Sequence, residues 1–173
     1  MRKRLVWLFA LFALVLIASV CVINAYNFAF AETDEYYVIC KPKSEINARK
    51  RATVQSPVVA TLYFGQKVES DGKEKNDFIH VVNLPAESTS GWVYKGLLSE
   101  YEPIESTGYA QIFGAEKVAA RKYGCRESQV KKWLADGQTV KIYAISERWC
   151  VTEHGYVMTE FLTVNAPVRG WKP

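Results

Sequence analysis

The protein has 173 residues, of which 49% are hydrophobic, 23% charged and 13% aromatic, and its formal net charge is +4. This composition excludes an intrinsically disordered or low-complexity chain and leaves room for one or two small domains. Three of the 22 basic residues, Arg2, Lys3 and Arg4, lie at the N-terminus. The remainder is therefore close to neutral, which argues against a nucleic-acid partner.

Residues 1–31 have the pattern of a secretory leader. A basic start precedes an apolar run at residues 5–23, and a more polar stretch leads to Ala29-Phe30-Ala31, which has the small residues of a cleavage site. We expect cleavage after Ala31. The alternative is an uncleaved membrane anchor, which would contact the membrane through residues 5–23, because this run approaches the length that spans a bilayer. Both interpretations place the rest of the chain outside the cytoplasm, secreted or associated with the cell envelope.

The apolar runs after the leader are too short for helices and predict β-strands. They are rich in β-branched and aromatic residues and are separated by turn-forming residues, a spacing typical of small antiparallel barrels. The clearest runs are residues 58–62, 78–82, 92–94, 140–145 and 149–152. Two polar stretches, residues 71–77 and 84–90, are expected to be loops.

The chain also contains an internal repeat. The matching blocks are residues 48–50 with 120–122, 65–68 with 137–140, and 91–93 with 155–157. Residues 109–123 and 127–135 taken alone also fit helices, but the equivalent part of the first copy contains Pro57 and several β-branched residues. Since homologous copies share a fold, we expect strands in both.

The repeat divides the chain into two domains of similar size. We place them at residues 36–99 and 108–164, joined by an acidic linker at residues 100–107 and followed by a tail at residues 165–173. A linker this short restricts the mutual orientation of the two domains.

Each copy resembles a bacterial SH3 domain, an accessory module of exported and cell-wall proteins. The first copy carries that family's Asn-x-Arg start, Pro-Val-Val-x-x-Leu strand, Gly-x-x-Val turn and Gly-Trp-Val strand, at residues 47–49, 57–62, 65–68 and 91–93. The second copy is similar to a variant, with residues 118–121, 132–134, Trp149 and residues 155–157. The resemblance implies an all-β fold of two small SH3-like barrels in tandem after the N-terminal signal or anchor helix.

Three cysteines, Cys40, Cys125 and Cys150, remain once the leader is removed. A disulfide between Cys125 and Cys150 is one interpretation, and small buried apolar residues are the other. No spacing matches a metal site, and two histidines are too few to complete one, so we expect neither a metal nor a cofactor.

The sequence contains no set of residues that predicts catalysis. Motifs for a nucleophile elbow, a phosphate-binding loop or a metalloprotease helix are missing. Cys150 and His154 are the nearest approach to a nucleophile and base, but a strand followed by a turn would not bring them together. We therefore expect a protein that is not an enzyme.

Candidate ligand-binding residues are aromatic and basic. Aromatic rings can stack on sugars or hold a peptide, although most rings in so small a barrel are needed for its core. An arginine can bind the carboxylates of an envelope polymer, or it can brace its own barrel by binding loop carbonyls. The candidates are Trp92, Tyr94, Trp149, Tyr156, Arg49 and Arg121.

The expected partner is a cell-wall polymer, with peptidoglycan or its stem peptide favoured by the resemblance. The protein would then be an exported binding module. An adaptor or inhibitor that binds another exported protein is the alternative.

Overall fold

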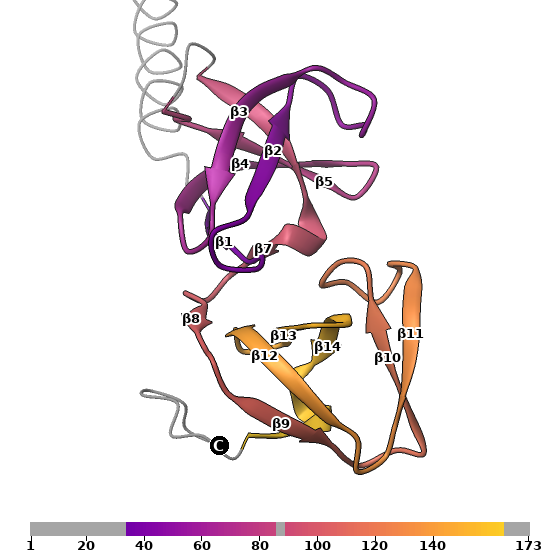
Figure 1. Cartoon of the computed structure of the whole chain (residues 1–173). Helices are drawn as coiled ribbons and strands as arrows, with labels where there is room; N and C mark the ends of the chain where they lie inside the picture. The colour runs from indigo at the N-terminus through magenta and orange to yellow at the C-terminus, as the bar shows by residue number, and fades with distance from the viewer. Residues whose placement is uncertain (1–33, 86–88, 165–173) are drawn as a thin grey trace, which may run out of the picture. The chain divides into compact units, whose positions relative to one another are not determined.

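The computed structural model describes residues 34–85 and 89–164, all of which belong to one compact unit, Thr33–Pro173 (Figure 1). The expected signal or anchor at residues 1–31 and the tail at residues 165–173 lie outside the described residues. The described part is all-β, as expected, and is built from two antiparallel sheets. It contains no helix that is long and apolar enough to cross a membrane.

The first sheet is formed by the first half of the chain in the order β3-β2-β6-β5-β4-β1-β7. Its elements are β1 (Asp34–Val38), β2 (Glu45–Arg49), β3 (Val58–Tyr63), β4 (Lys67–Lys75), β5 (Phe78–Val82), β6 (Ser90–Tyr94), the 3-10 turn η1 (Lys95–Leu97) and β7 (Leu98–Ser99).

The second sheet has the order β11-β10-β14-β13-β12-β9-β15, with β8 paired to β12 beside this path. Its elements are β8 (Ile104–Glu105), β9 (Tyr109–Ile112), β10 (Lys117–Arg121), β11 (Val130–Ala135), β12 (Thr139–Ile145), β13 (Trp149–Thr152), β14 (Gly155–Met158), the 3-10 turn η2 (Thr159–Phe161) and β15 (Leu162–Val164).

The two sheets have the same strand order, which confirms the internal repeat at the level of topology. Even an irregularity is repeated: the register shifts between Ala48 and Arg49 in the first copy and between Ala120 and Arg121 in the second. Residues 109–112, 117–121 and 130–135 are strands, so the choice of strand over helix is confirmed. The hydrogen-bonded path is open in both sheets, so neither closes into the barrel that we expected.

Each sheet buries its own apolar cluster, because alternate residues of a strand face the same side. In β2 the inward residues are Ile46 and Ala48, and in β10 they are Val118 and Ala120. Both pairs are less than 10% exposed, and each belongs to the core of its sheet.

The segment predicted as a loop at residues 71–77 is mostly strand. β4 continues to Lys75 and pairs with β5 through Glu74 and Ile79. Only Asn76 and Asp77 form the turn, and both have positive φ, 51° and 61°. Asn and Asp tolerate this conformation and favour two-residue hairpins. The extra length of the first copy at this point is therefore a longer hairpin. Within the other predicted loop, Ser90 already belongs to β6.

The predicted linker also contains a strand. Ile104 and Glu105 form β8, which pairs with Ile145 and Ala144 of β12. Part of the linker is thus an integral part of the second sheet.

Candidate functional site

Arg49 and Arg121 have the same structural role in the two copies. Arg49 donates from Nη1 to the carbonyl of Ser56 at 2.7 Å, and Arg121 donates to the carbonyl of Ser128 at the same distance. The two serines are buried, and their hydroxyls accept backbone N–H bonds within the same loops. This confirms that each arginine braces a loop of its own copy.

Replacing Arg121 by alanine is expected to lower the free energy of unfolding by about 1.5–3 kcal/mol, because it leaves the carbonyl of buried Ser128 without its charged donor. Arg126→Ala is the control, since Arg126 is exposed and no hydrogen bond or ion pair of its side chain occurs within the described residues. Urea unfolding of both variants tests this. Equal losses would contradict the bracing role.

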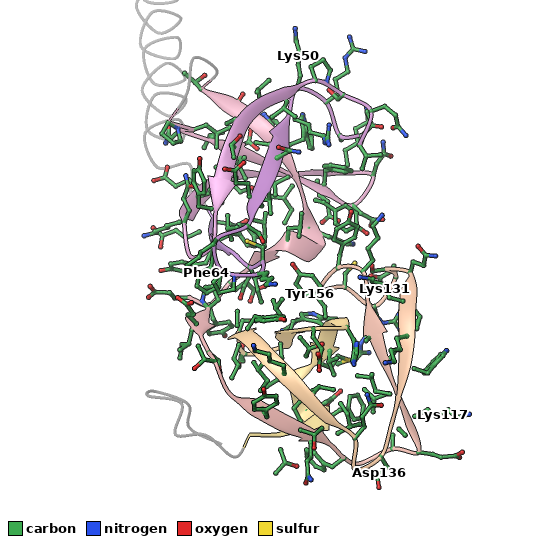
Figure 2. All side chains as sticks on the ribbon, viewed as in Figure 1. Lys50, Phe64, Lys117, Lys131, Asp136 and Tyr156 are labelled. Carbon is green, nitrogen blue, oxygen red and sulfur yellow. The ribbon has the colours of Figure 1, made fainter. Side chains whose placement is uncertain are left out.

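Tyr156 joins the two copies instead of facing solvent. Its hydroxyl donates to the carbonyl of Ile39 in the first copy at 2.8 Å. Both residues belong to a cluster with Ala144 and Val151, against which Phe64 packs (Figure 2). Burial raises the pKa of the Tyr156 phenol, so it remains a hydrogen-bond donor at neutral pH.

Two glycines make the contact between the copies very close. The N–H of Gly124 donates to the carbonyl of Gly96 at 2.8 Å. A Cβ on Gly96 would lie 2.8 Å from the Cβ of Tyr123, so no larger residue fits without a shift. The segments around these glycines separate two hollows, which share no lining residue.

The first hollow, here called the tyrosine hollow, has a volume of about 330 Å³. Its rings are in contact: Tyr94 and Tyr123 lie 4.8 Å apart between centroids, and Phe78 meets Tyr94 edge-on at 5.4 Å. Its lining residues are Cys40, Glu45, Ile46, Asn47, Arg49, Val54, Phe78, Tyr94, Leu97, Lys122, Tyr123 and Tyr156. The structure thus brings together three of the predicted ligand-binding residues, Arg49, Tyr94 and Tyr156.

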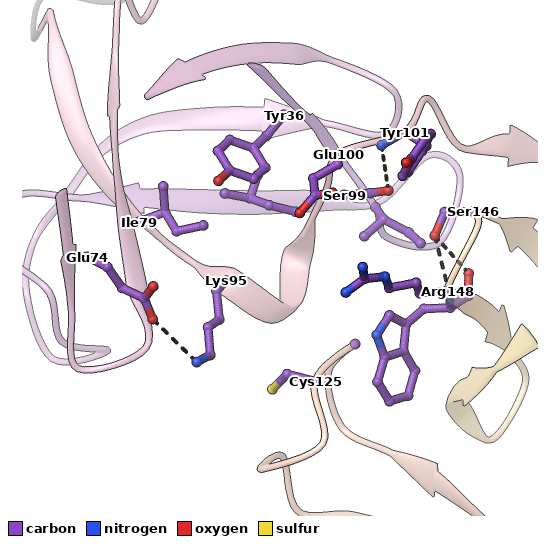
Figure 3. A pocket seen from close by; sticks show the side chains of 14 residues that line it. Tyr36, Glu74, Ile79, Lys95, Ser99, Glu100, Tyr101, Cys125, Ser146 and Arg148 are labelled. Atoms are coloured by element: carbon purple, nitrogen blue, oxygen red, sulfur yellow. Dashed lines mark hydrogen bonds and ion pairs between the residues drawn. The ribbon is translucent and has the colours of Figure 1, made fainter. Parts of the chain in front are cut away.

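The second hollow, here called the charged hollow, has a volume of about 300 Å³ and contains the predicted Trp149. Figure 3 shows the acidic and basic side chains that point toward its centre. Its lining residues are Tyr36, Ile39, Glu74, Ile79, Lys95, Leu98, Ser99, Glu100, Tyr101, Gly124, Cys125, Ser146, Arg148 and Trp149.

Trp92 and Arg121 line neither hollow. The Trp92 ring lies 4.9 Å from His80, whose Nδ1 is 3.0 Å from a carboxylate oxygen of Asp71. Trp92 pairs with Arg49 as Tyr156 pairs with Arg121. The two aromatic residues are therefore equivalent in register, although only Tyr156 reaches the other copy.

Several lining residues escaped the sequence analysis. Tyr123 and Lys122 belong to the loop after β10, and Arg148 directly precedes β13. Lys122 ends the repeated block at residues 120–122 and Tyr123 follows it, whereas Arg148 lies beside no repeated block. Neither hollow could be predicted, because its walls come from residues far apart in the chain.

The three described cysteines are free thiols, and the predicted Cys125–Cys150 bridge is not formed. Cys150 lies fully buried in the core of the second sheet, whereas Cys125 Sγ lies 3.5 Å from the Tyr94 hydroxyl at the contact between the copies. Burial raises the pKa of Cys150 to about 12 and that of Cys40 to about 11. Both thiols therefore stay protonated at neutral pH and are poor nucleophiles.

No protein-family model matches the sequence, and no curated protein does. Among solved structures, the chain is similar to NlpC2 from Trichomonas vaginalis, with 16% identity, a TM-score of 0.33, and coverage of 83% of this chain and 52% of the other. For NlpC1 from the same organism the identity is 18%, the TM-score 0.32, and the coverage 78% and 46%. The chain spans about half the length of these two proteins.

Proposed function

We propose that the protein is an exported, non-enzymatic tandem of SH3-like domains that binds a cell-envelope polymer, specifically peptidoglycan or its stem peptide. The resemblance of both copies to bacterial SH3 domains supports this proposal, as does the identical strand order of the two sheets.

The tyrosine hollow is the observation that carries the proposal. Tyrosine rings offer flat apolar faces for a sugar ring, and their hydroxyls offer hydrogen bonds to its substituents. Arg49 uses Nη1 to brace its loop, which leaves its other N–H groups for a ligand. The lining contains two basic residues, Arg49 and Lys122, and one acidic residue, Glu45. This excess of positive charge favours a carboxylate-bearing glycan or peptide.

The test is cosedimentation of the purified full chain with isolated peptidoglycan, with and without its attached anionic polymers, across a salt series. Tyr123→Ser is expected to reduce retention about tenfold, because a lost stacking contact is worth roughly 1.4 kcal/mol. Tyr109→Ser is the matched control, since Tyr109 is 58% exposed and lies outside the tyrosine hollow. Absence of retention at every salt concentration would reject the proposal. Retention that is lost with the anionic polymers would assign binding to charge alone.

One observation favours the second candidate function, an adaptor or inhibitor of another exported protein. The second copy exposes three large aromatic residues, Trp133 at 59%, Tyr109 at 58% and Phe113 at 44%. Exposed aromatic residues are enriched in protein interfaces. Co-purification of an exported protein that is lost in a Trp133→Ser variant, with wall retention absent, would favour this function.

A further inference from the structure

We propose that the charged hollow is a second binding site, which takes a zwitterionic ligand carrying one carboxylate and one ammonium group, as a dipeptide with both termini free does. The site is separate from the tyrosine hollow and goes beyond the function proposed above. It stands on the charges of its walls, on its size and on its continuity with a neighbouring hollow.

One group of charges at the charged hollow is already engaged within the protein. Lys95 lies 2.9 Å from Asp77 and 3.3 Å from Glu74. The bond to Asp77 and then that to Glu74 outweigh partial burial and raise the pKa of Lys95 to about 12. Lys95 is thus held as a cation by its own carboxylates and is not the group that selects a ligand.

The other pair of charges is left for a ligand. Arg148 extends its guanidinium into the hollow from the second copy, and Glu100 lines the same hollow from the start of the linker (Figure 3). Both side chains are exposed, and within residues 34–85 and 89–164 neither has a hydrogen bond or an ion pair. A guanidinium binds a carboxylate in a two-point geometry, and a carboxylate binds an ammonium group. A simple anion would leave Glu100 opposed to it, whereas a zwitterion matches both walls.

The remaining lining gives the ligand a fixed surface with one further donor. Burial raises the pKa of Tyr36, and the nearby carboxylates of Asp34, Glu100 and Glu74 raise it further, so its hydroxyl stays protonated. The wall beside Trp149 is held by two hydrogen bonds, because the Ser146 hydroxyl donates to the Trp149 carbonyl at 3.1 Å and accepts from the Trp149 N–H at 3.4 Å. This part of the wall therefore needs little rearrangement to receive a ligand.

The size of the hollow fits one or two amino-acid residues. Its volume of about 300 Å³ is at the lower end of small-molecule sites. An adjacent hollow of about 630 Å³ shares Gly124, Cys125, Arg148 and Trp149 with it. A side chain of the ligand can therefore extend into this adjacent hollow while the carboxylate stays at Arg148.

The test is an NMR titration of the full chain with alanyl-alanine, with the N-acetylated dipeptide, which lacks the ammonium group, and with the dipeptide amide, which lacks the carboxylate. We expect the free dipeptide to bind about tenfold more tightly than either capped form, since each cap removes one ion contact. Arg148→Gln is expected to bind the free and amidated peptides equally. Glu100→Gln is expected to bind the free and acetylated peptides equally.

Arg51→Gln and Glu102→Gln are the matched controls, because both residues are exposed and line neither hollow. Both should keep the wild-type preference for the free dipeptide. Equal binding of all three peptides, or no shift at any concentration, would overturn the proposal. Dipeptide binding without wall retention would reject the proposed function alone, and the reverse result would reject this site alone.

Discussion

Replacing Gly155 by alanine is expected to destabilise the second sheet by about 2–4 kcal/mol, through a backbone clash added to an unfavourable φ. Gly155 begins β14 with φ +128°, and a Cβ there would lie 2.3 Å from the carbonyl oxygen of Arg121. To remove this clash, β14 must move away from β10, which disrupts the pairing of Arg121 with Tyr156. The loss should appear as a lower midpoint in urea unfolding followed by tryptophan fluorescence.

The Gly137→Ala variant measures the cost of an unfavourable φ in the absence of a backbone clash. Gly137 also has positive φ, +74°, but no atom lies within 4 Å of the position of its Cβ. It should therefore lose only about 1 kcal/mol, the cost of the unfavourable φ. If the two variants unfold at the same urea concentration, the close approach of β14 to Arg121 does not limit stability.

Tyr156→Ala is expected to cost about 3–5 kcal/mol, the usual range for removing a buried aromatic ring. The variant loses the bond to the Ile39 carbonyl and the ring that fills the cluster between the copies. Because that cluster couples the copies, we also expect one unfolding transition to become two, with the second sheet less stable than the first. Unfolding followed by tryptophan fluorescence and by circular dichroism measures both effects.

Two further variants serve as controls for Tyr156→Ala. Tyr156→Phe keeps the ring and removes only the hydroxyl, so it should cost about 1 kcal/mol. Tyr109→Ala removes a ring that is 58% exposed and should stay within about 0.5 kcal/mol of the wild type. A single transition with unchanged midpoint in Tyr156→Ala would show that Tyr156 does not hold the copies together.

The sequence predicted well what depends on local pattern. Short apolar runs rich in β-branched and aromatic residues indicated the strands, and the repeated Ala-Arg-Lys blocks placed Arg49 and Arg121 at equivalent points of two equivalent sheets. Loop bracing was one of the two roles that the sequence left open for these arginines, and the structure confirms it. The hairpin at Asn76 and Asp77 was missed because its polar strand residues resemble a loop.

The sequence by itself therefore determined the all-β class and the repeat. Only the tertiary structure decided that Tyr156 joins the copies, and that Arg148 and Glu100 line the same hollow. The physical reason is that a residue pattern shows which side of a strand is buried, but not which distant segment covers it. Contacts between the copies join residues far apart in the chain, by 117 positions for Tyr156 and Ile39, and arise only when both sheets have formed.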